Sequence, residues 1–484
     1  MRFKYAALLA TAGLVFTMLG APASAGTTVP TASIATVGTR NGGGEPSLVT
    51  GPGGMLYASW PGDIMGFARS GNGGKTWTQG GQPADAGSVG DTSVSTDASG
   101  AVYETNLNVV NFPDNTQNSL QISLWKSFDK GATWPQEATG ALEPTNASGQ
   151  PFFVDRQWTD AWIPPHKTTN QAVVGLSYHD FVPSQIWVNM STDGGRTFGP
   201  PVDVINSPLA EADSFCSTIP GGLRIVPSGP HAGRIYVAWL AADAANAATG
   251  CNLTQLQAFH TVWTAWSDDL GKTWTDQLVF DAGPLHDGSE IFADLTLDNQ
   301  GNPYVAFPMN IGNEYDMFVE YSLDGGKTWN GKSDGTGTPY QASTSTGTHY
   351  FAAIGAGKPG EVDVAYLYSP TVVTSLPDGK PNEPTSDANA DWYIHMSQTT
   401  NLASGKFTEV NFTPQSVHHG DVCTLGIFCA AVPGTNRDLL DFIDLAVDSH
   451  GLAHVAFTSV DGQMPEGIFA ANQTGGPTVG AGGH

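Results

Sequence analysis

The segment Ser267-Asp-Asp-Leu-Gly-Lys-Thr-Trp274 decides the fold, because four other segments repeat its pattern Ser-x-Asp-x-Gly-x-Thr-Trp. A pattern of this length that recurs along one chain marks an architecture of repeated units. In the copies, Asn72 replaces the Asp and Phe198 replaces the Trp. The other copies are Ser70-Gly-Asn-Gly-Gly-Lys-Thr-Trp77, Ser127-Phe-Asp-Lys-Gly-Ala-Thr-Trp134, Ser191-Thr-Asp-Gly-Gly-Arg-Thr-Phe198 and Ser322-Leu-Asp-Gly-Gly-Lys-Thr-Trp329.

Each copy has the composition of a tight hairpin turn. The Asp side chain accepts hydrogen bonds from backbone N–H groups inside the loop, and glycine adopts the positive φ that the turn needs. The Trp ring is expected to pack beneath the turn, between neighbouring sheets. The pattern therefore predicts equivalent structural hairpins and carries no chemistry of its own.

A second signal precedes each hairpin: a short strand, a turn that ends in glycine, and an apolar strand. The clearest examples run from Phe292 to Phe307 and from Phe442 to Phe457. Short strands separated by turn signals are typical of all-β folds. The last two of the units have lost the hairpin pattern. Seven units are expected, beginning near Glu45, Asp91, Asp155, Cys216, Phe292, Tyr350 and Phe442.

The hairpin pattern resembles the Asp-box of sialidases and related β-propellers. The resemblance covers nearly the whole chain after residue 25 at the level of repeats, and it implies an all-β fold with a single β-propeller of four-stranded blades over residues 26–471. The copies start 57, 64, 76 and 55 residues apart, which favours seven blades and leaves six, the number in sialidases, as the alternative.

The two ends of this region fit a closed ring. The last unit lacks its fourth strand, and Thr31 to Val37 is a spare strand that we expect to complete it. Closure of this kind removes exposed sheet edges. The glycine-rich residues 472–484 are predicted to form a disordered tail.

The first 25 residues have the pattern of a secretory signal peptide. Arg2 and Lys4 precede an apolar run from Tyr5 to Leu19, and Ala23-Ser-Ala25 is a small-x-small cleavage site. We therefore expect a secreted, extracellular protein.

The cysteines agree with this location. An even number of cysteines in a secreted chain favours disulfides over free thiols. Proximity in the sequence favours Cys216–Cys251 and Cys423–Cys429, and no Cys-x-x-Cys pair supports a metal site.

The formal net charge of −26 narrows the choice of partners. Nucleic acids and anionic membranes both need basic surfaces, so we expect neither, and a monomer is assumed. No cofactor is expected. Bound Ca²⁺ would suit an acidic chain, but no contiguous Asp/Asn loop with EF-hand spacing supports it.

Ligands of propellers bind where the innermost strands converge, so the loops that lead into those strands matter most. Arg69 and Arg196 lie at hairpins and are expected to face outward, and Arg224 and Arg234 flank a turn. This leaves three arginines beside the innermost strands: Arg40, Arg156 and Arg437.

The resemblance to sialidases implies roles for these loop residues. Three arginines would hold a sugar carboxylate through forked hydrogen bonds. A retaining sialidase also needs a Tyr nucleophile paired with a Glu, and an Asp acid/base. The corresponding candidates are Tyr350, Glu290, and Asp91 or Asp155; the remaining candidates for substrate binding are Glu45, Asp294, Asp441 and His349.

Two features oppose direct transfer of this activity. The Arg-Ile-Pro signature of sialidases is absent, since Arg40 is followed by Asn-Gly-Gly-Gly-Glu-Pro. An acidic protein also repels an anionic substrate unless the pocket reverses the field locally. Asp294 and Asp444 occupy the same inner-strand position as Ser47 and Ser93, where a polar residue either lines the channel or binds a neighbouring blade's backbone.

The leading functional hypothesis is a secreted, glycan-active, sialidase-like glycoside hydrolase with a carbohydrate ligand, which removes terminal sugars, acidic sugars included. A propeller that binds glycan or protein without catalysis is the second hypothesis, because propellers host many functions. The third is a polysaccharide lyase, since His349-Tyr350 and the loop pair His418-His419 supply residue types that abstract a proton beside a uronate.

Overall fold

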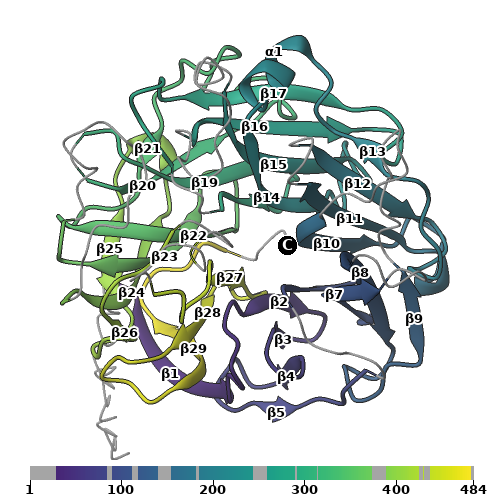
Figure 1. Cartoon of the computed structure of the whole chain (residues 1–484), viewed down its shortest axis with the longest axis horizontal. Coiled ribbons are helices and arrows are strands. Elements are labelled where there is room, and N and C mark those ends of the chain that lie inside the picture. Colours follow the sequence, from purple (N-terminus) through teal and green to yellow (C-terminus); the bar gives the residue numbers. More distant parts are fainter. Residues whose placement is uncertain are drawn as a thin grey trace, which may run out of the picture.

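Seven antiparallel sheets stand around a common axis and form the blades of a β-propeller (Figure 1). The computed structural model describes residues 29–83, 90–111, 118–139, 154–180, 185–243, 259–288, 292–312, 314–372, 389–424, 429 and 436–480. The predicted all-β propeller with seven four-stranded blades is therefore confirmed. The innermost strand of each blade lies nearest the axis (Figure 1).

The first four blades follow the chain from the axis outward. Blade one is β2 (Ser47–Gly51), β3 (Met55–Trp60), β4 (Gly66–Ser70) and β5 (Thr78–Gln79). Blade two is β6 (Thr92–Thr96), β7 (Val102–Asn111), β8 (Asn118–Ser127) and β9 (Gln136–Thr139). Blade three is β10 (Val154–Trp162), β11 (Val173–Asp180), β12 (Ile186–Ser191) and β13 (Val202–Asp203). Blade four is β14 (Ser217–Ile225), β15 (Ile235–Ala242), β16 (Phe259–Ser267) and β17 (Thr275–Asp281).

The other three blades complete the ring. Blade five is β18 (Asp294–Leu297), β19 (Pro303–Met309), β20 (Asp316–Tyr321) and β21 (Tyr340–Gln341). Blade six is β22 (Thr348–Ala356), β23 (Val362–Ser369), β24 (Asp391–Thr399) and β25 (Thr408–Asn411), with β26 (His418–His419) paired to β24. Blade seven is β27 (Asp444–Val447), β28 (Ala453–Ser459), β29 (Gly467–Gly475) and β1 (Thr31–Gly38).

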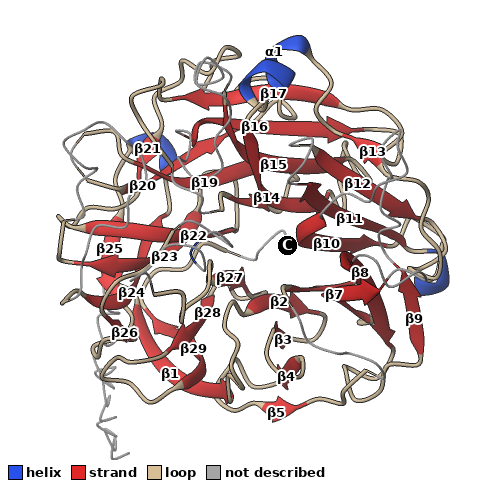
Figure 2. Ribbon diagram, viewed as in Figure 1, coloured by secondary structure: helices blue, strands red, loops and turns tan. Residues whose placement is uncertain are grey.

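Helix is scarce in the described residues. Helix α1 (Pro208–Asp213) lies at the outer edge of the ring (Figure 2), and the 3₁₀ turns η1 (Thr169–Gln171) and η3 (Leu402–Ser404) are single turns. The core lies between successive sheets, because each middle strand is covered on both faces. All residues of β15 and β19 are buried for this reason.

The repeated segments form hairpin turns between the third and fourth strands, as their composition predicts. In the copy between β16 and β17, Asp269 Oδ1 accepts the Thr273 N–H at 2.9 Å and its Oδ2 accepts the Thr273 hydroxyl at 2.7 Å. The Trp274 indole N–H donates to the Gly271 carbonyl at 3.2 Å. These bonds stay within the turn, so the segments stabilise the outer rim of the ring.

The N-terminal strand closes the ring, as expected. Strand β1 pairs antiparallel with β29 as the fourth strand of blade seven, with Ala35 opposite Ala470. The prediction of a disordered tail from residue 472 is wrong up to residue 480, because β29 continues to Gly475 and Val479 is buried. Gly357 permits this contact, since a Cβ there would lie 1.6 Å from the Val479 carbonyl oxygen.

Hydrogen bonds from inner-strand side chains tie successive blades together. The inner-strand register predicted for Ser47, Ser93, Asp294 and Asp444 is confirmed, and each side chain binds a backbone N–H of the next blade. The four bonds are Leu48 N to Asp444 at 2.7 Å, Val94 N to Ser47 at 3.2 Å, Thr159 N to Ser93 at 3.1 Å and Ile354 N to Asp294 at 2.8 Å. Asp294 therefore holds blades five and six together.

Arg224 lies beside the axis, contrary to the expectation that it only flanks a turn. It lines a small cavity of about 30 Å³ together with Ser47, Trp158 and Asp444, and its Nη2 lies 4.0 Å from Asp294 Oδ1. A β-bulge in β14 between Pro220 and Leu223 shifts the register and directs this arginine inward.

Candidate active site

A cavity opens at the mouth of the ring, defined here as the end of the axis where the innermost strands begin. Its volume of about 450 Å³ lies within the range of about 300–1,000 Å³ that small-ligand pockets occupy. Apolar walls face several carboxylates. The lining residues are Gly42, Gly43, Glu45, Pro61, Gly62, Asp63, Gly90, Asp91, Leu107, Leu120, Asp155, Phe292, Arg437, Leu440 and Asp441.

Four of the carboxylates form the acid cluster: Glu45, Asp91, Asp155 and Asp441. Each belongs to a residue at or just before the start of an innermost strand, from blades one, two, three and seven. Strands that converge on one axis bring these chain-distant loops together, which is why the loop residues were predictable as a group.

Glu45 is the most deeply buried member of the acid cluster, with 2% of its surface exposed. Its Oε1 accepts the Asp441 backbone N–H at 2.7 Å. Burial, and then the charges of Asp91 and Asp441, raise the pKa of Glu45 well above its ordinary value. The buried environment of Glu45 therefore favours the protonated form of its carboxyl.

Asp91, the neighbour of Glu45, also has a raised pKa. Burial and the neighbouring Asp155 carboxylate raise the pKa of Asp91, while Arg156 and a hydrogen bond with Glu45 oppose the rise. Two interacting carboxyls titrate as a pair, so the protons belong to Glu45 and Asp91 jointly. Asp155 is half-buried, and its Oδ2 lies 3.8 Å from the His179 imidazole.

Arg437 is bound to Asp441 inside the cavity wall. Its two Nη atoms donate to the two carboxylate oxygens of Asp441 at 2.7 and 2.5 Å. A bidentate pair of this kind uses the fork that a sugar carboxylate would need. The pair fixes the loop that leads into β27 and places Asp441 beside Glu45.

Arg156 packs against a group of aromatic rings next to the acid cluster. Its guanidinium carbon is 3.9 Å from the ring centroid of Trp158 and 3.9 Å from that of Phe442, and these two rings touch each other with centroids 5.6 Å apart. The side chain is 1% exposed and Nη1 donates to the Thr92 carbonyl at 3.0 Å. Arg156 is therefore fully buried and does not line the cavity.

Backbone strain gathers at the same place. Glu45, Arg156 and Leu440 have positive φ angles of 47°, 39° and 60°, a conformation that side-chain-bearing residues seldom adopt. Strain of this kind costs about 1–3 kcal/mol for each residue and is concentrated at functional sites. Three such residues around one cavity favour a functional role for it.

The other candidates lie elsewhere. Arg40 is absent from the cavity lining, and its Nε lies 3.5 Å from Glu466 Oε1. Tyr350 is buried between Tyr315 and Trp392, at ring centroid distances of 5.4 and 5.5 Å. Glu290 lies outside the described residues. The three predicted arginines therefore do not present three free forks to one ligand.

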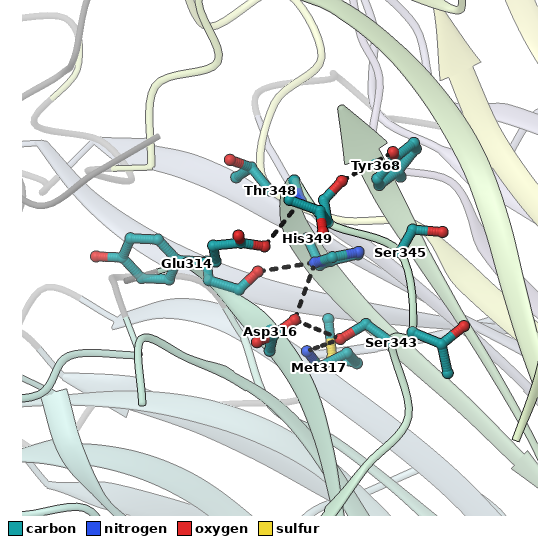
Figure 3. A network of polar contacts seen from close by, with 12 residues as sticks. Glu314, Asp316, Met317, Ser343, Ser345, Thr348, His349 and Tyr368 are labelled. Carbon is teal, nitrogen blue, oxygen red and sulfur yellow. Dashed lines mark hydrogen bonds and ion pairs between the residues drawn. The ribbon is translucent and has the colours of Figure 1, made fainter. Parts of the chain in front are cut away.

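His349 lies between blades five and six in a polar network (Figure 3). Its Nδ1 lies 2.8 Å from the Tyr315 carbonyl and 3.5 Å from Asp316 Oδ1, and its ring packs against Tyr368. Burial lowers the pKa of His349. It is fully buried and does not line the cavity.

Residues that the sequence analysis missed complete the site. Gln157 donates its amide N–H to the Asp91 carbonyl at 2.6 Å, and Phe292 forms part of the cavity wall. The repeat register gave a usable signal for Phe292 and Phe442, since both lie two residues before the inner-strand positions Asp294 and Asp444.

One disulfide braces the loop that leads to Arg437. Cys423 is bonded to Cys429, as predicted, and the Cys423 N–H donates to the Asn436 carbonyl at 2.9 Å. Cys216 is also disulfide-bonded, while its predicted partner Cys251 lies outside the described residues.

Two kinds of feature are absent from the described part of the chain. None of its His, Cys, Asp and Glu side chains gather in threes or more in an arrangement suited to a metal ion. Its helices include no segment of the length and apolarity needed to cross a membrane.

The fold and this site define a β-propeller with an acidic cavity at its mouth, and known structures share the fold. No known family profile matches the chain. An ulvan lyase, a polysaccharide lyase solved bound to -[GlcA(1-4)Rha3S]-, is 13% identical, with 93% of this chain and 96% of that chain covered and a TM-score of 0.52. A second structure of an ulvan lyase is 12% identical, with 95% and 97% covered and a TM-score of 0.51.

Sialidases are also among the structural neighbours. The intramolecular trans-sialidase from Ruminococcus gnavus is 14% identical, with 92% of this chain and 97% of that chain covered and a TM-score of 0.40. At these identities the likeness to the lyases shows a shared propeller fold, and the reaction has to be argued from the site.

Proposed function

We propose that the chain is a glycan-active glycoside hydrolase whose active site is the cavity at the mouth of the ring. The observation that carries the proposal is the carboxyl pair of the buried Glu45 and the half-buried Asp91, whose pKa values are both raised, next to the half-buried Asp155. Glycoside hydrolysis needs one carboxylic acid that protonates the leaving oxygen and one carboxylate on the reacting centre.

The roles follow from the environments of the carboxyls. The Glu45–Asp91 pair, with its raised pKa, would donate a proton to the glycosidic oxygen. Asp155 would act as the second carboxylate, either activating water or attacking the sugar. Phe292, Leu107 and Leu120 supply apolar surface of the kind on which the faces of a sugar ring pack.

An uncharged terminal sugar suits this cavity better than sialic acid. Arg437 is bound to Asp441, Arg156 is buried against aromatic rings, and Arg40 lies beside Glu466. An anionic sugar would meet the carboxylates of the acid cluster without a free arginine fork.

We also propose that the protein works outside the cytoplasm. The Cys423–Cys429 disulfide supports this location, because disulfides persist in oxidising compartments. Fractionation of the native host, followed by immunoblotting, tests it: the proposal requires the protein in the extracellular fraction, and a cytoplasmic protein with reduced thiols would contradict it.

A panel of 4-methylumbelliferyl glycosides tests the proposed reaction. The panel contains neutral sugars, amino sugars and a sialoside, and the expected result is release from an uncharged sugar with none from the sialoside. Glycan-array binding without release from any glycoside would favour the non-catalytic alternative. New ultraviolet absorbance from an unsaturated uronate, on a uronate polymer, would favour a lyase.

A further inference from the structure

Two consecutive side chains on β10 donate hydrogen bonds to the backbone at Asp91 and Thr92. Arg156 Nη1 donates to the Thr92 carbonyl at 3.0 Å, and Gln157 Nε2 donates to the Asp91 carbonyl at 2.6 Å. Consecutive side chains of a regular strand point to opposite faces, so two such contacts with one neighbouring strand need a local irregularity.

A β-bulge provides that irregularity. The pairing of β10 with β11 shifts between Asp155 and Gln157, which leaves Arg156 unpaired with a positive φ of 39°. Bulges next to active sites redirect side chains. Here the bulge turns both Arg156 and Gln157 toward blade two.

The charged groups around Arg156 are three members of the acid cluster and Asp444 on the innermost strand β27. Asp91, Glu45, Asp444 and Asp155 all favour its charged form, while burial opposes it. Asp91 in turn faces Asp155, Arg156, Glu45 and Arg437. Arg156 thus lies next to the Glu45–Asp91 pair, fully buried, outside the cavity lining and packed against the Trp158 and Phe442 rings.

We infer that Arg156, supported by Gln157, is a positioning residue that fixes Asp91 and sets the pH range in which the Glu45–Asp91 pair keeps its proton, without touching the sugar. This inference rests on the proposed function for its kinetic readout. It replaces the earlier expectation that Arg156 binds a substrate carboxylate.

The pH dependence of kcat/KM for Arg156→Met tests the inference. Without the cation, the pKa of the pair rises further, so the alkaline limb of the profile should move upward by about 1 pH unit or more, with KM nearly unchanged. Arg156→Lys retains the positive charge, so the alkaline limb of its pH profile should lie close to that of the unmodified protein. Arg224→Met is the matched control, because Arg224 also lies beside the axis and faces Asp294 instead of the pair; its limb should not move.

Two further measurements distinguish an error in the role of Arg156 from an error in the proposed function, and they also cover a variant that does not fold. Infrared titration of the buried carboxyls needs no turnover: a shifted titration in a chain that cleaves no glycoside would support the role of Arg156 and contradict the proposed function. If Arg156→Met does not fold, Gln157→Leu should lower kcat severalfold at constant KM. An unmoved limb with a raised KM, an unchanged titration in folded Arg156→Met, or a fully active Gln157→Leu would overturn the inference.

Discussion

Glu45 accepts the backbone N–H of Asp441 at 2.7 Å, although the two residues lie 396 positions apart in the chain. This bond joins the loop before blade one to the loop before blade seven. The strand pairing of β1 with β29 closes the same two blades at their outer edge. Ring closure and the assembly of the acid cluster are therefore one structural event.

Deletion of Thr31 to Gly38 should prevent a stable ring. The change removes β1, leaves β29 as an exposed edge, and opens the chain to edge-to-edge association. We expect aggregation, measured by size-exclusion chromatography and light scattering. A monomeric truncated protein with the original melting temperature would contradict the closure.

Asp444→Ala should destabilise the ring. The change leaves the N–H groups of Leu48 and Leu445 without their acceptor, and each buried unsatisfied group costs about 1–3 kcal/mol. Urea unfolding measures the loss. The exposed Asp438→Ala is the control. An equal loss of unfolding free energy in both variants would show that the Asp444 hydrogen bonds do not stabilise the ring.

Trp329→Ala should lower the free energy of unfolding by about 3–5 kcal/mol, the range for deletion of a large buried aromatic side chain. Trp329 is fully buried, and its indole N–H donates within its own turn. The half-buried Trp77 of the first hairpin is the matched control, and Trp77→Ala should cost less. If Trp329→Ala lost specific activity at unchanged stability, the hairpins would have a role in catalysis and not only in the fold.

Glu320 should make the protein less stable in alkaline solution. Burial raises the pKa of Glu320 from 4.5 to about 8. The neutral form is favoured in the fold, so this contribution is complete below pH 4.5 and is lost as the pH rises to about 8. Glu320→Gln should flatten this part of the curve of melting temperature against pH.

The exposed Glu137→Gln is the control for this experiment, and its curve should match that of the unmodified protein. Equal pH dependence in all three proteins would show that Glu320 does not titrate in this range.

The sequence predicted the ring because the repeat is strictly local. The Asp269 turn and its equivalents bind their own backbone, so their pattern survives in any copy and can be counted. The convergence of Glu45, Asp91, Asp155, Arg437 and Asp441 followed from the same count, since each precedes or begins an innermost strand.

The sequence could not predict which arginines face the axis. A bulge in β14 turns Arg224 inward and a bulge in β10 redirects Arg156 and Gln157, and both depend on strand pairing that has no fixed residue pattern. The ion pair of Arg437 with Asp441 could not be predicted either, because the sequence does not show whether an arginine side chain is already bound to a carboxylate.

The proposed hydrolysis requires that Glu45 belong to the acid that drives glycoside cleavage. Its most direct test compares Glu45→Gln with Glu104→Gln on the glycoside that the unmodified protein cleaves fastest. Burial also raises the pKa of Glu104 well above its ordinary value, but Glu104 is absent from the cavity lining. Glu45→Gln should lower kcat by about 10²–10⁴-fold, the contribution typical of general acid–base catalysis, while Glu104→Gln keeps full activity per folded molecule. A folded Glu45→Gln variant with unchanged kcat would contradict the account.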